Sequence, residues 1–214
     1  KAPYTFKNFA PIANYIKDPF SMVVAANGKY KTLKDVIDAA KANPGGIKVA
    51  SSGNMSPGHL TTLLLAKAAG VNFAVLFFDQ QGEQRASLLG GHTDVEVNPQ
   101  SEVVGAVKSG EVVPIAIFDS QPSKYLPNVP TSDSLGYKVA ITSQRGISFP
   151  AGTPPEIVNI VADAVKKTMS DPAHTKRIED MFLLPYYQGP AEYAKTWQDM
   201  EGPVKQLIDE ATKK

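Results

Sequence analysis

Short apolar runs alternate with amphipathic segments through the middle of the chain. The runs are of strand length, and between them apolar residues recur every three or four positions, as on one face of a helix. Strands are predicted at 47–51, 73–78, 94–97 and 112–118, and helices at 32–42, 57–69, 82–89 and 102–108. This alternation predicts an α/β fold in which parallel strands are joined by helices.

The two ends of the chain have a different pattern. Apolar runs at 9–16 and 20–26 predict two strands before the alternating region, and a proline-rich loop follows it at 121–130. An interrupted apolar run then covers 139–149. The remaining predicted elements are helices at 155–169, 172–181 and 190–211.

This change of pattern predicts two lobes. Residues 27–116 form one contiguous α/β lobe, and residues 1–26 together with 117–214 form a second, discontinuous lobe. The chain would pass between the lobes twice, near Ala26 and near Ala116, and we expect these passages to form a hinge.

The composition is that of an ordinary globular protein. The chain has 214 residues, of which 43% are hydrophobic and 20% charged, with a net charge of +1. A balance this close to zero argues against binding nucleic acid, because proteins that do so carry a basic face or arm. The absence of cysteine excludes a disulfide framework and a thiolate zinc site. No apolar run approaches the ~20 residues that a membrane-spanning helix needs.

Three segments follow predicted strands and precede predicted helices, namely 51–54, 79–81 and 98–100. In α/β sheets, ligands bind beyond the carboxyl ends of the strands. We therefore expect these three segments to meet at one cleft.

The first of these segments is suited to binding an anion. Ser56 is a favourable N-cap and Pro57 fits the first helical turn, so hydroxyls, an amide and backbone N–H groups gather at the positive end of a helix. The predicted anion-binding residues are Ser51, Ser52, Gly53, Asn54, Met55 and Ser56. The alternative is an ordinary strand-to-helix turn, in which Ser, Asn and Gly are common.

Other polar residues complete the candidate site. In the first turn of that helix, a neutral His59 imidazole can donate to a bound carboxylate or hydrogen-bond the preceding loop instead. Gln80 and Gln81 start the next helix and can contact a distal polar group of the ligand. Asn98 and Gln100 can do the same from the third segment.

Four further residues have less specific surroundings. Phe77 and Phe78 end an apolar strand and are expected in the core; if one ring faces the cleft instead, it favours a flat or apolar acid over citrate. Arg85 and Arg145 are potential charge partners for a ligand, but lone arginines on helices and strands are usually solvated, which is the alternative here.

No metal site, cofactor site or catalytic site is predicted. His92 and His174 are expected on the surface, and the three histidines lack metal-ligand spacing. Ser52 and His59 suggest a hydrolase, but Ser52 lacks the glycines of a Gly-x-Ser-x-Gly elbow. No glycine-rich nucleotide-binding loop occurs either. We therefore expect a binding protein rather than an enzyme.

Four motifs of the chain resemble those of one known family. They are Ser51-Ser-Gly-Asn-Met-Ser-Pro-Gly-His59, Leu88-Leu-Gly-Gly-His-Thr-Asp94, Leu126-Pro-Asn-Val-Pro-Thr131 with Gly136, and Pro150-Ala-Gly-Thr-Pro154. In this order and spacing, over nearly the whole chain, they resemble the substrate-binding proteins of tripartite tricarboxylate transporters, the Bug or TctC family.

The resemblance implies a periplasmic binding protein of a Gram-negative bacterium, with a two-lobed, type II-like Venus-flytrap fold. Such proteins capture a small organic acid and deliver it to the membrane subunits of a secondary transporter. The acid can be a dicarboxylate, a tricarboxylate, an acidic amino acid or an aromatic acid. We expect a monomer that needs no cofactor.

The resemblance also concerns the start of the chain. Family members usually begin with a strand, a binding loop and a helix before the point that matches Lys1. We therefore expect that the lobe with both termini lacks its first strands, and that the chain is a processed product or an excerpt.

The chain departs from the family pattern in two places. Where the family commonly has Pro-Tyr-Lys-Gly-Gly, this chain has Phe77-Phe-Asp-Gln-Gln81. Where the family commonly has Asp after the next strand, this chain has Asn98. An acidic residue and amides thus replace a lysine and glycines. The resemblance therefore indicates carboxylate binding without indicating which organic acid is bound.

Two other functions stay open. A protein of the same fold can sense a ligand and signal to a membrane receptor instead of supplying a transporter. A structural or interaction domain would bind no small molecule at all.

Overall fold

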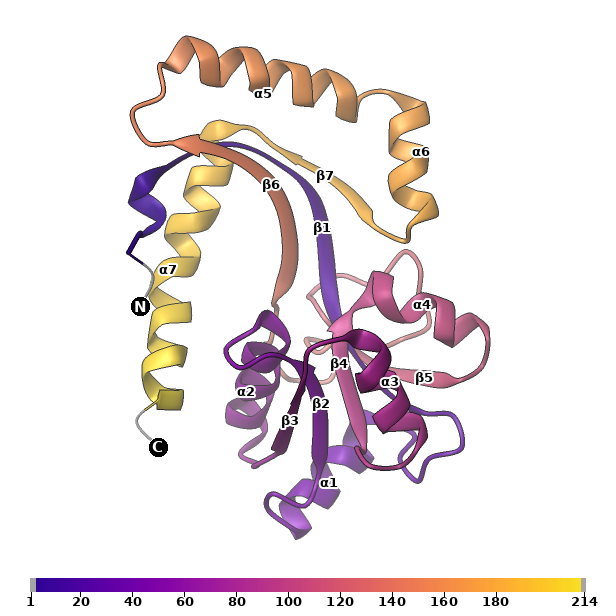
Figure 1. Cartoon of the computed structure of the whole chain (residues 1–214). Coiled ribbons are helices and arrows are strands. Elements are labelled where there is room, and N and C mark those ends of the chain that lie inside the picture. The colour runs from indigo at the N-terminus through magenta and orange to yellow at the C-terminus, as the bar shows by residue number, and fades with distance from the viewer. Residues whose placement is uncertain (1–2, 213–214) are drawn as a thin grey trace. The chain divides into compact units, whose positions relative to one another are not determined.

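The computed structural model describes residues 3–212, and these residues belong to two units (Figure 1). The contiguous unit is Pro19–Ser143, and the discontinuous unit combines residues 1–18 with 144–214. These boundaries differ from those of the expected lobes. The reason is that Phe20–Ala25 pairs with strands of the contiguous unit, and residues 130–141 bond and pack there as well. The hinge near Ala26 and Ala116 stays a prediction.

The contiguous unit contains a mixed sheet in the order β3-β2-β4-β1-β5. Its strands are β1 (Phe9–Ala25, of which the second half lies here), β2 (Lys48–Ser52), β3 (Ala74–Phe78), β4 (Val95–Pro99) and β5 (Val112–Phe118). β2 is parallel to both β3 and β4, which confirms the predicted parallel units. β1 is antiparallel to β4 and β5, and its insertion between them makes the sheet mixed.

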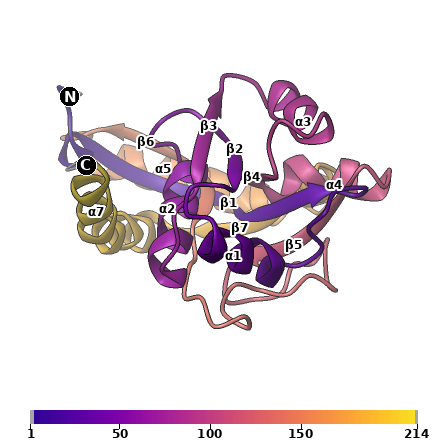
Figure 2. The same cartoon turned by 90° about the horizontal axis from the view of Figure 1, so that it is seen from below.

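Helices cover both faces of this sheet. They are α1 (Leu33–Ala42), α2 (Pro57–Ala69), α3 (Gln81–Leu89) and α4 (Gln100–Lys108). Apolar residues of α1 and α2 share the main core with Val95 and Val97 of β4. The alternate residue Glu96 points to the opposite face and contacts α3. Accordingly, α1 and α2 lie on one face and α3 and α4 on the other (Figures 1 and 2).

Thr32 sets the start of α1. Its side chain accepts a hydrogen bond from the Asp35 N–H at 3.1 Å, and the Asp35 carboxylate accepts one from the Thr32 N–H at 2.9 Å. This reciprocal capping satisfies two backbone donors that the first turn of a helix leaves unpaired, and it agrees with the helix predicted over 32–42.

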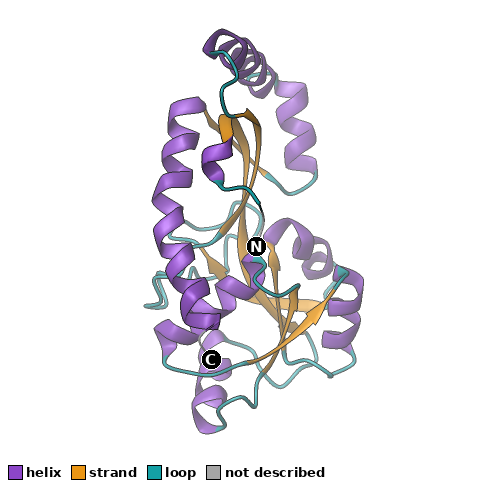
Figure 3. Cartoon of the chain, turned by 60° about the vertical axis from the view of Figure 1, so that its left-hand side comes forward, coloured by secondary structure: helices purple, strands orange, loops and turns teal. Residues whose placement is uncertain are grey.

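The discontinuous unit combines the first half of β1 with the C-terminal elements. β6 (Thr142–Pro150) and β7 (Leu184–Gln188) pair with β1, and the helices are α5 (Pro155–Met169), α6 (Pro172–Asp180) and α7 (Pro190–Thr212). Figure 3 distinguishes these helices from the strands. The buried clusters here are small; one consists of Ile12, Ala13 and Ala162. Within the described residues, no helix is both long enough and apolar enough to cross a membrane.

β1 is a single strand of 17 residues rather than the two strands that the sequence predicts. Its pairing changes at Pro19: residues up to Lys17 pair with β7, whereas residues from Phe20 pair with β4 and β5. The polar interruption before Phe20 therefore marks a change of partner in a backbone that stays extended. The sequence prediction also missed β7, because Pro185 interrupts a run that is only half-buried.

Candidate ligand-binding site

The three predicted segments lie at one edge of the sheet in the contiguous unit. β2, β3 and β4 are adjacent and parallel, with Ser52 paired to Phe78 and Ala50 paired to Glu96. Their carboxyl ends therefore lie side by side, and the three segments follow them. The helices α2, α3 and α4 each begin at this edge, so their positive N-terminal ends face it.

The start of α2 has fewer unpaired donors than the sequence predicts. The Ser56 Oγ accepts the His59 N–H at 3.3 Å, and its own hydroxyl donates to the Ser52 carbonyl. The Met55 N–H donates to His59 Nδ1 at 3.1 Å, and the Ser56 N–H donates to the Gly53 carbonyl at 3.4 Å. Met55 and Ser56 thus use their backbone donors within the turn itself, and anion binding at this turn stays a prediction.

Two of the predicted residues in this turn stay accessible. Gly53 and Asn54 are exposed, whereas Ser52 is half-buried, with its Oγ 3.4 Å from that of Ser56. Gly53 and Met55 both have positive φ angles, 39° and 60°. Met55 is not a glycine, so the turn holds it in a sparsely populated conformation.

His59 forms the loop hydrogen bond that was the alternative to ligand binding. Because Nδ1 accepts from Met55, the neutral ring carries its hydrogen on Nε2 and can donate from there. The ring is 8% exposed and packs edge-on against Phe77, with centroids 4.8 Å apart. Burial lowers the pKa of His59 and keeps the ring neutral. Phe77 itself is 43% exposed, so its expected place in the core is wrong.

Ser51 is fully buried where β2 meets the start of α2. Its Oγ has no hydrogen-bond partner among the residues that the structure describes. A Cβ added to Gly58 would lie 2.9 Å from this oxygen and 3.1 Å from the Val97 carbonyl oxygen. The absence of a side chain at Gly58 thus allows α2 to approach the sheet and brings its first turn against Ser51.

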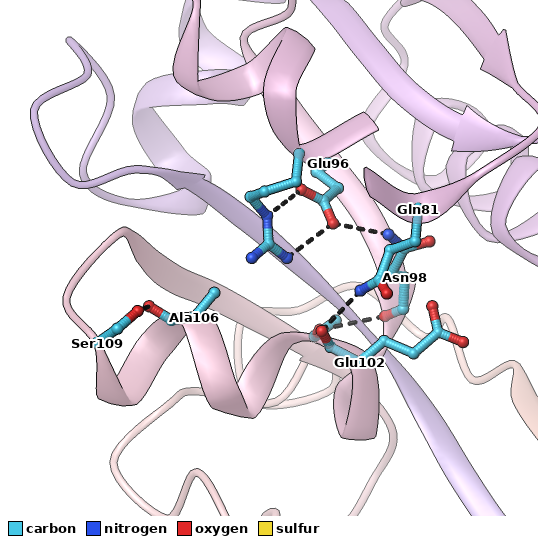
Figure 4. A network of polar contacts seen from close by, with 8 residues as sticks. Gln81, Glu96, Asn98, Glu102, Ala106 and Ser109 are labelled. Carbon is cyan, nitrogen blue, oxygen red and sulfur yellow. Dashed lines mark hydrogen bonds and ion pairs between the residues drawn. The ribbon is translucent and has the colours of Figure 1, made fainter. Parts of the chain in front are cut away.

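A buried ion pair lies on the opposite face of the sheet (Figure 4). Glu96 is fully buried and contacts Arg85 through two bonds, Nε to Oε2 at 2.7 Å and Nη2 to Oε1 at 2.9 Å. Burial alone would lower the pKa of the Arg85 guanidinium, but the hydrogen bond and charge of Glu96 outweigh it and raise that pKa. Arg85 is thus bound within the protein rather than solvated or available to a ligand.

Glu96 is a site residue that the sequence prediction missed. The available signal was an acidic side chain inside the apolar run Val95–Val97, a position that requires a cationic partner. Asn98, two residues further on the same face, donates from Nδ2 to Glu96 Oε1 at 2.7 Å. Asn98 is 2% exposed, so this amide belongs to the buried network.

The glutamines of the candidate site differ in their surroundings. Gln80 is exposed and makes no side-chain cap for α3. Gln81 uses Nε2 to donate to the Glu102 carbonyl at 2.7 Å and thereby joins the starts of α3 and α4. Gln100, the first residue of α4, is fully buried.

The orientation of the Gln100 amide follows from its neighbour. The Ser123 Oγ accepts hydrogen bonds from the backbone N–H groups of Tyr125 at 3.1 Å and Leu126 at 3.0 Å. Its single hydrogen is donated to Gln100 Oε1. The Nε2 of Gln100 is then a buried donor, and within the described part of the chain it has no partner.

A separate cavity of about 380 Å³ lies at the other edge of the sheet, near Thr93 and Asp94, which precede β4. None of the predicted site residues lines it. Among the described residues, no cluster of side chains has the composition of a metal site.

A family model described as the tripartite tricarboxylate transporter family receptor, TctC, matches residues 1–212. This chain belongs to that family. A relative, the UPF0065 protein of the gbd 5' region of Cupriavidus necator, is 33% identical over 98% of this chain and 66% of its own length. The chain thus spans slightly less than two thirds of that relative.

Solved structures share the fold of this chain. A TctC solute-binding protein from Polaromonas, without ligand, has a TM-score of 0.85 and 26% identity, and covers 98% of this chain; the match spans 72% of that protein. MatC from Rhodopseudomonas palustris, with bound malate, has a TM-score of 0.84 and 22% identity, over 97% of this chain and 72% of its own. The α/β fold with two lobes and the TctC-family resemblance of the sequence are both confirmed.

Proposed function

We propose that this TctC-family chain reversibly captures a small organic carboxylate in the periplasm and delivers it to the membrane subunits of a tripartite tricarboxylate-type transporter. The observation that carries the proposal is a pair of buried donors without partners, Ser51 Oγ and Gln100 Nε2, at the edge where three strands end. A carboxylate offers acceptor sites on both oxygens and can supply the missing partners.

The energetics favour an anion at this edge. A buried donor without a partner costs about 1–3 kcal/mol, and a ligand that satisfies the donor recovers that cost. The N-terminal ends of α2, α3 and α4 add favourable electrostatic potential, although Arg85 is held by Glu96. Binding would therefore rely on oriented dipoles in a buried setting, where each polar contact is stronger than in water.

The family supports the chemical class of the ligand. The family is described as a transporter receptor family, and MatC, which has a similar fold, holds malate. In the proposed role, the chain binds its ligand as a monomer and without turnover.

A panel of organic acids tests this proposal in a thermal-shift assay. The panel contains succinate, malate, aspartate, citrate and benzoate, and succinamide serves as the uncharged control. A ligand at 100 times its dissociation constant adds about 2.7 kcal/mol of stability, so at least one acid should raise the Tm clearly while succinamide does not. The proposal is wrong if no acid raises the Tm, or if succinamide raises it equally.

A further inference from the structure

The buried network around Glu96 fixes the direction of the Asn98 amide. The Glu96 carboxylate is already bound by Arg85 at both oxygens, and as an ionised group it only accepts hydrogen bonds. The amide must therefore present its Nδ2 to Glu96, as the 2.7 Å contact shows. The opposite orientation would set two acceptor oxygens against each other in a buried place.

The other end of the amide is then an acceptor at the ligand edge. Glu96 lies two residues before Asn98 on the same strand face, so Oδ1 is directed away from Glu96, toward the carboxyl end of β4. Among the described residues, the hydrogen bond of the Asn98 side chain uses its Nδ2 and leaves Oδ1 available.

The neighbouring Gln100 offers the complementary group. Ser123 holds its Oε1, so its unpartnered buried Nε2 is a donor. One turn of chain thus provides an acceptor, Asn98 Oδ1, and a donor, Gln100 Nε2, each with its orientation set by a neighbour inside the protein. A plain carboxylate satisfies only the donor.

We propose that Asn98 makes this site selective for acids that carry a hydroxyl or ammonium group next to a carboxylate, with Glu96 as the positioning residue that aims the amide. Such a 2-hydroxy or 2-amino acid donates to Asn98 Oδ1 and accepts from Gln100 Nε2. An acid without that donor would cover this oxygen without pairing it, which lowers its affinity. This inference rests on the proposed function and specifies its substrate class.

The test measures dissociation constants by calorimetry for succinate, the two malate enantiomers and aspartate. These acids have the same carbon skeleton and differ in the group beside one carboxylate. In the natural sequence, malate or aspartate should bind at least tenfold more tightly than succinate. Equal or tighter binding of succinate would overturn the inference while leaving the proposed function in place. If none of the acids in the whole panel binds, the proposed function fails, and the inference fails with it.

Two variants assign the selectivity to the network. Asn98→Leu keeps the size of the side chain but cannot accept a hydrogen bond. The ratio of the succinate dissociation constant to the malate dissociation constant should therefore fall to within about twofold, while the affinity for succinate changes less than about threefold. Glu96→Gln can donate toward Asn98 and allows its amide to turn, so the ratio should fall with Asn98 unchanged. Asn72→Leu, the same change at an exposed position outside the candidate site, should keep the ratio of the natural sequence. If Glu96→Gln does not fold, Asn98→Leu decides alone, and an unchanged ratio in it would overturn the inference.

Discussion

At the scale of single residues, His59 shows how a predicted ligand contact can also be a structural group. Its Nδ1 is fixed by the Met55 N–H, and its ring is packed against Phe77. Only the neutral ring can accept that hydrogen bond. Protonation of His59 would therefore break the turn that precedes α2 as well as place a charge in a buried position.

This predicts a pH dependence of stability. Burial lowers the pKa of His59 in the folded state below its ordinary value of 6.5, so the unfolded chain binds more protons when the pH falls below 6.5. The contribution of His59 to stability is complete above pH 6.5 and is lost as the pH falls through the lowered value. Urea unfolding at pH 7.5 and pH 5.0 measures this loss.

His59→Asn is the matched variant, because its amide oxygen can accept from Met55 and does not titrate in this range. The free energy of unfolding of the natural sequence should fall more between the two pH values than that of His59→Asn. Parallel decreases in the two proteins would contradict the assignment.

At the scale of elements, the close approach of α2 to the sheet positions the buried Ser51 hydroxyl. Gly58 allows that approach, since the Val97 carbonyl and the Ser51 Oγ leave no space for a Cβ. The helix is fixed at the same point by its Ser56 cap and by Pro57 in the first turn. The start of α2 is therefore determined by packing as well as by capping.

Gly58→Ala should destabilise the protein by about 1–3 kcal/mol, because the added methyl group overpacks the contact between α2 and the sheet. The control is Gly105→Ala in α4, where an added Cβ meets no atom within 4 Å. That substitution should increase the stability by about 0.5–1 kcal/mol, since alanine favours a helix over glycine. Thermal unfolding compares the two, and a Gly58→Ala protein as stable as the natural one would contradict this view of the contact.

Most elements could be predicted from the sequence because their limits depend on local signals. Thr32 and Pro57 mark helix starts, and the apolar runs of β2 to β5 have strand length. Local signals do not indicate which strands pair with each other. The long strand β1 was predicted as two strands, because the change of pairing at Pro19 depends on β4, β5 and β7, which are distant in the sequence.

The same limit applies to the candidate site. The edge of the sheet at 51–54, 79–81 and 98–100 was predicted, since it follows from strand order alone. The direction of each polar group was not predicted, because it depends on the side chain that contacts that group. Examples are the pair of Arg85 with Glu96 and the bond from Ser123 to Gln100, which join residues with no local pattern between them.

At the scale of the whole molecule, family membership and the buried polar groups lead to the same function. The fold of this chain places three helix N-terminal ends at one edge of the contiguous unit, together with buried donors that have no partner among the described residues. The ordering of these groups costs stability that a bound anion would recover. The central claim is therefore that Ser51 and Gln100 contact the carboxylate of the ligand.

Calorimetric titration of two variants with the tightest-binding acid of the panel tests this claim most directly. Gln100→Glu keeps an oxygen for Ser123 but replaces the donor with a negative charge, and it should weaken binding at least a hundredfold. Ser51→Ala removes one donor and should weaken binding about tenfold. The controls Gln121→Glu and Ser109→Ala, at exposed positions, should bind like the natural sequence. Affinities of Gln100→Glu and Ser51→Ala within twofold of the natural protein would contradict the account.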